Sequence, residues 1–183
     1  MHVPQPRMVI SSVWFQAALL TFIIGFSVLT YLAIRINKDH PPIPAKVVTE
    51  AGRTLFTSDD VMAGQHLFQR YGLMQFGSIF GHGAYLGPDF TAQYLHRQSV
   101  LMASLYQSQG LSTAEAEDRV RRELKNNAYD PATGNLVHTA GQAQAFDSLV
   151  SFYTDFFGHS ERQQGLRRVH ISDTNEIRQL TAF

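Results

Sequence analysis

One stretch decides how this chain is organised: Tyr71-Gly-Leu-Met-Gln-Phe-Gly-Ser-Ile-Phe-Gly-His-Gly-Ala-Tyr-Leu-Gly-Pro-Asp-Phe90. It is mostly apolar and contains five glycines in twenty residues. Residues recur at helical spacing before it (Val61, Gly64, Gln65, Phe68, Tyr71) and after it (Phe90, Tyr94, Leu101, Leu105). An apolar loop of this length between two helices either wraps a ligand or packs tightly in the core. Glycine permits the positive φ angles and close backbone approaches that such a loop requires.

The composition limits what the rest of the chain can be. With 183 residues, no net formal charge and 44% hydrophobic residues, it suits one modest domain plus a membrane segment. The absence of cysteine excludes disulfides, zinc–thiolate sites, cysteine nucleophiles and c-type haem attachment. Neutral charge argues against nucleic acid as a partner. The densest cationic segment, residues 119–125, follows acidic residues closely and is interpreted as a solvated helix face.

A membrane anchor is predicted near the N-terminus. No charged side chain occurs from Met8 to Ile34, and Arg7 and Arg35 bracket this run. At about 1.5 Å per residue, such a helix crosses a hydrocarbon core of roughly 30 Å with some tilt. A cleaved signal peptide is the main alternative, but its apolar region is shorter and ends in small residues. The segment Arg35-Ile-Asn-Lys38 does not fit such a cleavage site.

The remainder is predicted to be mainly α, with minor β pieces. The prolines of His40–Pro44 indicate a stiff stalk. Capping signals predict helices beginning after Thr57, Asp89, Ser112 and Thr139 and ending near residues 71, 109, 126 and 158. Short strands are expected at residues 47–49, 54–56, near 129 and at 136–138. An inward stripe is expected on the fourth helix, at Phe146, Leu149, Tyr153 and Phe156.

The last residues predict a further helix that the sequence cuts short. Arg162–Arg168 is interpreted as a polar connection, and Val169–Ile171 as an extended piece. Asp173-Thr-Asn-Glu176 then signals a helix start, with Phe183 reached after about two turns. We expect the chain to be a fragment that continues, back into the membrane.

The eight histidines are the residues that a metal or haem would need. No two of them lie at the i, i+3 or i, i+4 spacing that places two ligands on one helical face. His82, between two glycines, is more simply a loop histidine than a ligand, and a metal site of His66, His82 and His96 is disfavoured. The metal prediction is therefore none.

Other motifs also favour structural roles. Gly77-x-x-x-Gly81 follows no strand and lacks the lysine of a phosphate-binding loop. Asp59, Asp60 and Asp89 are more simply helix caps than catalytic carboxylates. Six aromatic residues around the loop could form a ligand site but are more often core: Tyr71, Phe76, Phe80, Tyr85, Phe90 and Tyr94. The residues alone predict a membrane-tethered helical domain with a filled apolar pocket and no catalytic residue.

Several segments resemble one known family. They are Gly64-Gln65, Tyr71-Gly-Leu-Met74, Gly77-Ser-Ile-Phe-Gly-His-Gly-Ala-Tyr-Leu-Gly-Pro-Asp-Phe-Thr91, Tyr94-Leu-His-Arg97 and Asp173-Thr-Asn-Glu-Ile-Arg178. Together they resemble the N-terminal region of quinol-dependent nitric oxide reductase, a single-chain member of the haem–copper oxidase superfamily. The likeness extends over essentially the whole chain.

The resemblance implies a cytochrome c-like domain that has lost its haem. Related cytochrome c subunits carry Cys-x-x-Cys-His, and here Leu73, Phe76 and Gly77 occupy those positions. A vestigial haem pocket is implied at Leu73, Phe76, Gly77, Phe80, His82, Tyr85 and Pro88. Large side chains such as Met74, Phe76 and Phe80 are expected to fill the space that the haem would occupy.

The implied organisation has four parts. They are an N-terminal tail and transmembrane helix (1–38), a stalk (39–46), a haem-less cytochrome c-like extracytoplasmic domain (47–171) and the start of a second membrane helix (172–183). The resemblance places the chain in the cytoplasmic membrane with the domain facing the periplasm or cell exterior. Charge alone leans the other way, since Arg35 and Lys38 follow the helix and only Arg7 and the amino terminus precede it.

The parent enzyme is expected to reduce nitric oxide to nitrous oxide with quinol electrons. Its haem b, haem b3 and non-haem iron would be held by histidines on later membrane helices, so neither a catalytic residue nor a cofactor is expected in this chain. The expected partners are the membrane and the catalytic helix bundle. The alternative is a free-standing membrane-anchored binding module that uses the aromatic loop, and such a module would end in a cap or tail.

Overall fold

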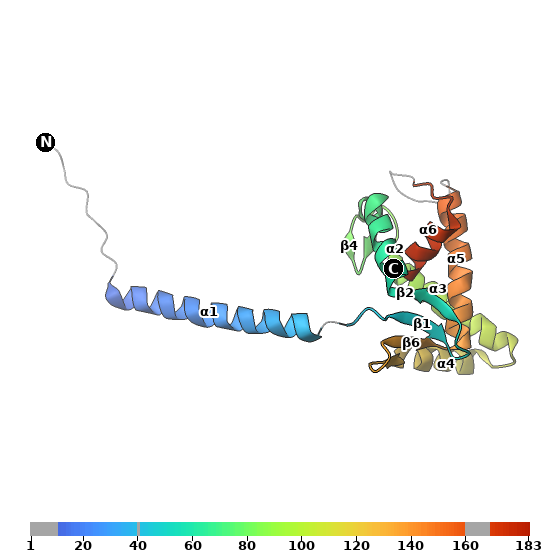
Figure 1. Ribbon diagram of the computed structural model, residues 1–183, viewed down its shortest axis with the longest axis horizontal. Coiled ribbons are helices and arrows are strands. Elements are labelled where there is room, and N and C mark those ends of the chain that lie inside the picture. Colours follow the sequence, from blue (N-terminus) through green and yellow to red (C-terminus); the bar gives the residue numbers. More distant parts are fainter. Residues whose placement is uncertain (1–10, 40, 160–168) are drawn as a thin grey trace. The chain divides into compact units, whose positions relative to one another are not determined.

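The computed structural model describes residues 11–39, 41–159 and 169–183 (Figure 1). The chain divides into two compact units, residues 1–42 and 43–183. Among the described residues, the first unit contains one long helix, and the second contains the sheets and the remaining helices.

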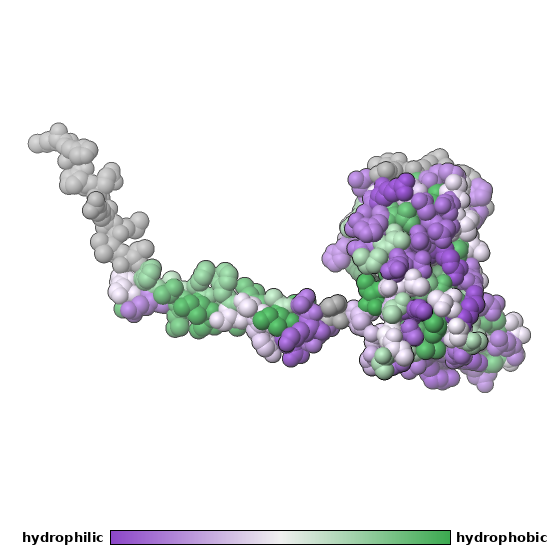
Figure 2. Space-filling view, viewed as in Figure 1, coloured by the Kyte–Doolittle hydropathy of each residue, from purple (hydrophilic) through white to green (hydrophobic). Residues whose placement is uncertain are grey.

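Helix α1 (Ser12–Asp39) is long and apolar enough to cross a membrane. No other helix in the described part of the chain meets both conditions. All of its described side chains are exposed, including Trp14 and Tyr31 at the two ends of the apolar run. Figure 2 shows an almost continuous hydrophobic surface that gives way to hydrophilic residues at the C-terminal end of the helix. An apolar helix with nothing packed on it fits a single-pass membrane anchor, as the sequence predicts.

The second unit contains a small mixed sheet. Its strands are β1 (Lys46–Thr49), β2 (Thr54–Thr57), β5 (Tyr129–Asp130) and β6 (Asn135–His138). Their order is β2-β1-β6-β5, with β1 and β6 parallel and the two outer pairs antiparallel. The sequence predicts all four strands. It does not predict the parallel pairing, because residues 46–49 and 135–138 lie far apart in the chain.

Five helices complete this unit (Figure 1). They are α2 (Ser58–Arg70), α3 (Phe90–Ser108), α4 (Thr113–Lys125), α5 (Ala140–Gly158) and α6 (Thr174–Ala182). The predicted caps are confirmed: a side-chain oxygen of Thr57, Asp89, Ser112, Thr139 and Asp173 accepts a hydrogen bond from an amide of the first turn. Mainly helical structure with minor strands is therefore the observed fold class.

Helix α5 lies at the centre of the core. It packs against α3 and α6, while α3 also packs on α4 and α2 on α6. The predicted stripe is buried, with Phe146 and Leu149 at 0% exposure and Tyr153 and Phe156 below a tenth. Where α2 meets α6, Gly64 is required, because a Cβ atom there would collide with the Gln179 carbonyl.

Helix α6 is built into this unit by apolar and polar contacts. Ile177 and Thr181 are buried. The Tyr71 hydroxyl donates to the Glu176 carboxylate at 2.5 Å, and Arg178 donates to the Leu55 carbonyl at 2.7 Å. The continuation of residues 172–183 into a membrane helix stays a prediction.

The connection to α6 is described only in part. Arg162–Arg168 lies outside the described residues. Val169 and Ile171, expected to be extended, are buried in the main apolar cluster without belonging to a strand.

Candidate functional site

The glycine-rich stretch folds into a compact turn followed by a hairpin. Its elements are the short 3-10 helix η1 (Leu73–Gln75) and the strands β3 (Ser78–Ile79) and β4 (His82–Gly83). The Ser78 amide donates to the Pro88 carbonyl at 3.0 Å, which closes the far end of the loop. At the tip, Phe80 has a φ of 50°, the only positive value among the described non-glycine residues. For a bulky side chain this backbone conformation is strained.

Asp89 holds the strained tip in place. One carboxylate oxygen caps α3 by accepting from the Ala92 amide at 2.9 Å. The other accepts from the Ser78 hydroxyl and the Gly81 amide, both at 2.7 Å. These hydrogen bonds, led by that from Ala92, hold the pKa of Asp89 below its ordinary value. Asp89 therefore caps α3, as the sequence predicts. Its carboxylate also fixes the tip of the hairpin through Ser78 and Gly81.

The three residues aligned with the haem-attachment motif are buried. Leu73 and Phe76 are each 1% exposed and belong to the main apolar cluster. Gly77 has no space for a side chain, since a Cβ atom would approach Phe90 Cε2 to 2.8 Å and the Pro88 carbonyl more closely. An imidazole cannot occupy this position unless the loop moves.

Three of the other proposed pocket residues lie at the surface, whereas Pro88 is part-buried. Phe80 is 78% exposed, Tyr85 is 86% exposed, and His82 is also exposed. Met74 is 48% exposed. The expectation that Met74 and Phe80 are packed inside the domain is therefore wrong, and of the three large side chains only Phe76 belongs to the core. The physical reason is the tip conformation, because the contacts of Asp89 and Thr91 hold Phe80 at a positive φ with its ring outward.

The three histidines weighed and disfavoured as a metal site belong to no cluster of possible ligands among the described residues. His66, His82 and His96 are all exposed. Within the described ranges, no three histidine, cysteine, aspartate or glutamate side chains form a group that could hold a metal ion.

An open apolar cleft of about 560 Å³ lies beside the hairpin. Its walls include Leu73, Ile79 and Phe80 from the hairpin region, Phe90 and Tyr94 from α3, and Leu136 from β6. The sequence predicts a filled pocket, and the structure corrects this. Of the six aromatic residues named as core or ligand site, Phe80, Phe90 and Tyr94 line the cleft, whereas Phe76 is core.

Some of the residues that line the cleft are polar. They include Gln98 of α3, Asn126 after α4, His138 of β6 and Gln142 of α5. The Nδ1 atom of His138 is buried and has no hydrogen-bond partner among the described residues. Burial lowers the pKa of His138 and so favours the neutral imidazole. Sequence reasoning did not single out His138 or these polar residues, because no motif or spacing marks them.

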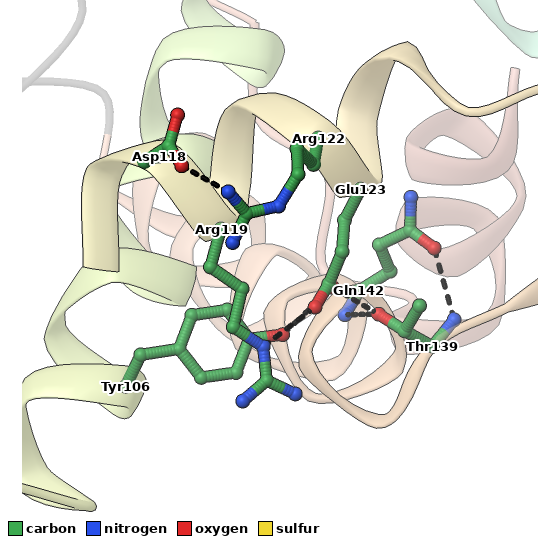
Figure 3. Close-up of polar contacts among 7 residues, drawn as sticks. All are labelled: Tyr106, Asp118, Arg119, Arg122, Glu123, Thr139 and Gln142. Atoms are coloured by element: carbon green, nitrogen blue, oxygen red, sulfur yellow. Dashed lines mark hydrogen bonds and ion pairs between the residues drawn. The ribbon is translucent and has the colours of Figure 1, made fainter. Parts of the chain in front are cut away.

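A separate polar cluster joins three helices (Figure 3). The Glu123 carboxylate of α4 accepts from Tyr106 of α3 at 2.7 Å, Thr139 at 2.6 Å and Arg119 at 2.9 Å. Burial raises the pKa of Glu123, but these hydrogen bonds outweigh burial and leave the pKa below its ordinary value. Burial and the bond to Glu123 raise the pKa of Tyr106 to about 12. Tyr106, Arg119 and Thr139 each donate a hydrogen bond to Glu123, so the cluster has a structural role in linking the helices.

The fold and the site together define a class of protein. It is a mainly helical domain with one helix of membrane-spanning length before it, whose residues at the haem-attachment positions are Leu73, Phe76 and Gly77. A family model for the cytochrome c-like domain of the nitric oxide reductase protein NorB matches residues 44–183. The match covers most of the chain, so the chain belongs to this family and corresponds to the N-terminal region of NorB. No individual curated protein matches the chain closely enough to count as a relative.

Proposed function

We propose that this chain is the N-terminal anchor and extracytoplasmic structural domain of a quinol-dependent nitric oxide reductase. The observation that carries the proposal is the packing of the attachment positions, where Leu73 and Phe76 are core residues and Gly77 has no space for a ligand. A domain of cytochrome c-like ancestry without these groups contributes structure rather than electron transfer. Its role is to pack over the catalytic helices of the parent enzyme on the outer side.

The residues present do not fit a covalently bound haem. Thioether attachment needs two cysteines, and the chain has none. An axial ligand at position 77 would collide with Pro88 and Phe90. No electron-transfer step is assigned to this domain. Of the residues expected in a vestigial pocket, Leu73, Phe76 and Gly77 serve as buried scaffold, whereas Phe80, His82 and Tyr85 lie at the surface.

The proposed electron donor is consistent with that loss. A quinol is soluble in the bilayer and reaches its enzyme from within the membrane, so a haem relay on the water-facing side is not needed. The parent enzyme would carry haem b, haem b3 and non-haem iron outside this chain. The reaction, nitric oxide to nitrous oxide, would then take place on histidines of later helices.

The test separates assembly from turnover in the reductase that contains this region. We expect Phe146→Ala, which opens a cavity in the core, to lower the haem b content per milligram of membrane protein several-fold. Nitric oxide reduction per haem b should be unchanged. Gln107→Ala on the exposed face of α3 serves as the control. Loss of turnover per haem b with normal assembly, or a c-type band in the pyridine haemochrome spectrum, would contradict a structural role.

The orientation is tested with the same cysteine-free chain. A single Ser104→Cys substitution lies on an exposed part of α3. We expect a membrane-impermeant maleimide to label it in intact spheroplasts, whereas Ser11→Cys before α1 is labelled only after lysis. The reverse pattern would place the domain in the cytoplasm, as the charges around the helix alone would suggest.

A second candidate is favoured by one observation. The open cleft of about 560 Å³ is the kind of apolar concavity that binding modules use. A membrane-anchored binding role is therefore retained as the alternative.

A further inference from the structure

We propose that the Phe80–Gly81 turn is a gate on the apolar cleft: when the turn relaxes, the Phe80 ring moves from solvent into the cleft and closes it. In the closed state the cleft is filled by a side chain of its own rim. The inference does not depend on the reductase role proposed above, because it follows from the turn, its hydrogen bonds and the cleft beside it.

The turn has an unusual residue at its first central position. Ile79 pairs with His82, so Phe80 and Gly81 form a two-residue hairpin loop. Both have a positive φ, 50° and 74°, which is the pattern of a type I′ turn. Asparagine, aspartate or glycine is favoured at the first position of this turn, and a phenylalanine there is strained. Strain of this kind is typical of segments that switch between two conformations.

A relaxed form of the turn requires a change at Phe80 alone. In a type II turn the first central residue has a φ of about −60°, and the second has a φ of about +80°. Gly81, at 74°, already fits the second position of that turn. Relaxation therefore rotates the two peptide groups on either side of Phe80, and this rotation redirects the Phe80 side chain.

Those two peptide groups are held by side chains at the start of α3. The Phe80 amide donates to the Thr91 hydroxyl at 3.2 Å, and the Gly81 amide donates to the Asp89 carboxylate at 2.7 Å. The Ser78 hydroxyl donates to the same carboxylate oxygen at 2.7 Å and orients it. Rotation of the peptide groups breaks the bonds to Thr91 and Asp89, so these bonds hold the turn in its strained form.

An apolar space lies beside the ring. Phe80 is 78% exposed, yet it lines the cleft together with Ile79 of the hairpin and Thr91 and Leu95 of α3. The cleft is open, and its volume of about 560 Å³ is large enough for a phenyl ring. Burial of the ring and release of the positive φ favour closure, whereas the bonds to Thr91 and Asp89 favour the open form. Because these contributions oppose one another, single side chains can decide between the two forms.

The test follows the ring in the full chain in lipid nanodiscs. The chain has one tryptophan, Trp14, so Trp14→Phe combined with Phe80→Trp leaves a single indole, which lies on the turn. Incorporated as 5-fluorotryptophan, the indole gives one fluorine resonance for each environment, and acrylamide quenching measures its exposure. We expect the exposed form to dominate while Asp89 and Thr91 are intact.

Two variants remove the bonds that hold the turn. Asp89→Asn keeps a side-chain oxygen that caps α3 but replaces the second acceptor by an amide donor. Thr91→Val removes the acceptor of the Phe80 amide at nearly the same volume. Each should shift the population toward a protected, less quenched form about tenfold, as expected for one lost hydrogen bond. Ala128→Phe, which places a ring in the cleft, should cancel both shifts.

Matched controls keep these bonds. Thr91→Ser retains the hydroxyl, and Asp173→Asn makes the same change at the cap of α6, so neither should protect the indole.

Three results would overturn the gate. The first is unchanged quenching in both Asp89→Asn and Thr91→Val. The second is increased quenching, which indicates a frayed hairpin. The third is protection that persists in Ala128→Phe, because the ring would then be buried elsewhere. If Asp89→Asn loses the melting transition of the domain, Thr91→Val decides alone.

Discussion

At the scale of single residues, Glu123 shows how one part-buried charge can connect three helices. Its side chain is 14% exposed and accepts hydrogen bonds from α3, from its own helix and from the N-cap of α5 (Figure 3). Thr139 also caps α5 through the Gln142 amide, so the carboxylate holds a residue that already orders the next helix. Charge-assisted bonds of this kind are stronger than neutral ones.

Replacing that charge should weaken the domain. We expect Glu123→Gln to lower the free energy of unfolding by about 1–2 kcal/mol, because hydrogen bonds to a charged acceptor are lost. The matched control is Asp118→Asn on the same helix, whose pair with Arg122 is solvent-exposed and should change stability by less than about 0.5 kcal/mol. Urea-pulse proteolysis of the full chain measures both, and equal effects would contradict the prediction.

The same carboxylate predicts the response to acid. The pKa of Glu123 is lowered in the folded state from an ordinary value of 4.5. A group with a lowered folded pKa contributes stability above its unfolded pKa and loses it as the pH falls through the folded pKa. The stability difference between wild type and Glu123→Gln should therefore be constant near neutral pH and shrink below about pH 4.5. A difference that grows in acid would refute the assignment.

At the scale of elements, the β3–β4 hairpin stores strain at Phe80. Its positive φ costs a bulky residue about 1–2 kcal/mol, whereas glycine adopts it freely. Phe80→Gly should therefore raise stability by about 0.5–1 kcal/mol after the added flexibility of the unfolded chain is subtracted. Tyr85→Gly, which is equally exposed but has no positive φ, should lower it by a similar amount. Thermal melting by circular dichroism distinguishes the two, and destabilisation by both would show that Phe80 is not strained.

The contact of α2 with α6 depends on the absence of a side chain. Gly64→Ala should lower the free energy of unfolding by about 1–3 kcal/mol, because the added methyl group meets the Gln179 carbonyl. Gly158→Ala, also in a helix but facing open space, should be neutral or stabilising by up to about 1 kcal/mol. Hydrogen exchange of α6 amides in the full chain reports the effect, and protection in Gly64→Ala equal to that of wild type would contradict it.

The elements were largely predictable from sequence because their signals are local. Thr57, Ser112 and Thr139 each stand three residues before a side chain that completes a capping box, and all three boxes form. The site was less predictable, since its outcome depends on contacts between distant segments. The sequence predicted that the Phe80 side chain fills a pocket, but contacts of the hairpin tip with Asp89 and Thr91 leave it exposed. No sequence motif pointed to His138.

At the scale of the whole molecule, we expect α1 to anchor the protein in the membrane. We expect the chain to remain in the membrane fraction after alkaline carbonate extraction. Ile23→Arg, in the middle of the helix, should release most of it, since a central arginine costs about 2.5–3.5 kcal/mol on insertion. Ile36→Arg, near Arg35 and Lys38 at the helix end, should be retained. Release of both variants, or of neither, would contradict the prediction that α1 spans the membrane with Ile23 near its centre and Ile36 near its end.

The parallel pairing of β1 with β6 has a consequence for biogenesis. Val47 lies opposite Leu136, so the two partners are made many seconds apart on the ribosome. A chain that emerges N-terminus first can pair β1 with β2 early, but it leaves the other edge of β1 unpaired until β6 has been made. Contacts between such distant residues slow folding. The domain is thus expected to fold late and in one cooperative step, and a ribosome stalled before residue 135 should carry a protease-sensitive nascent chain.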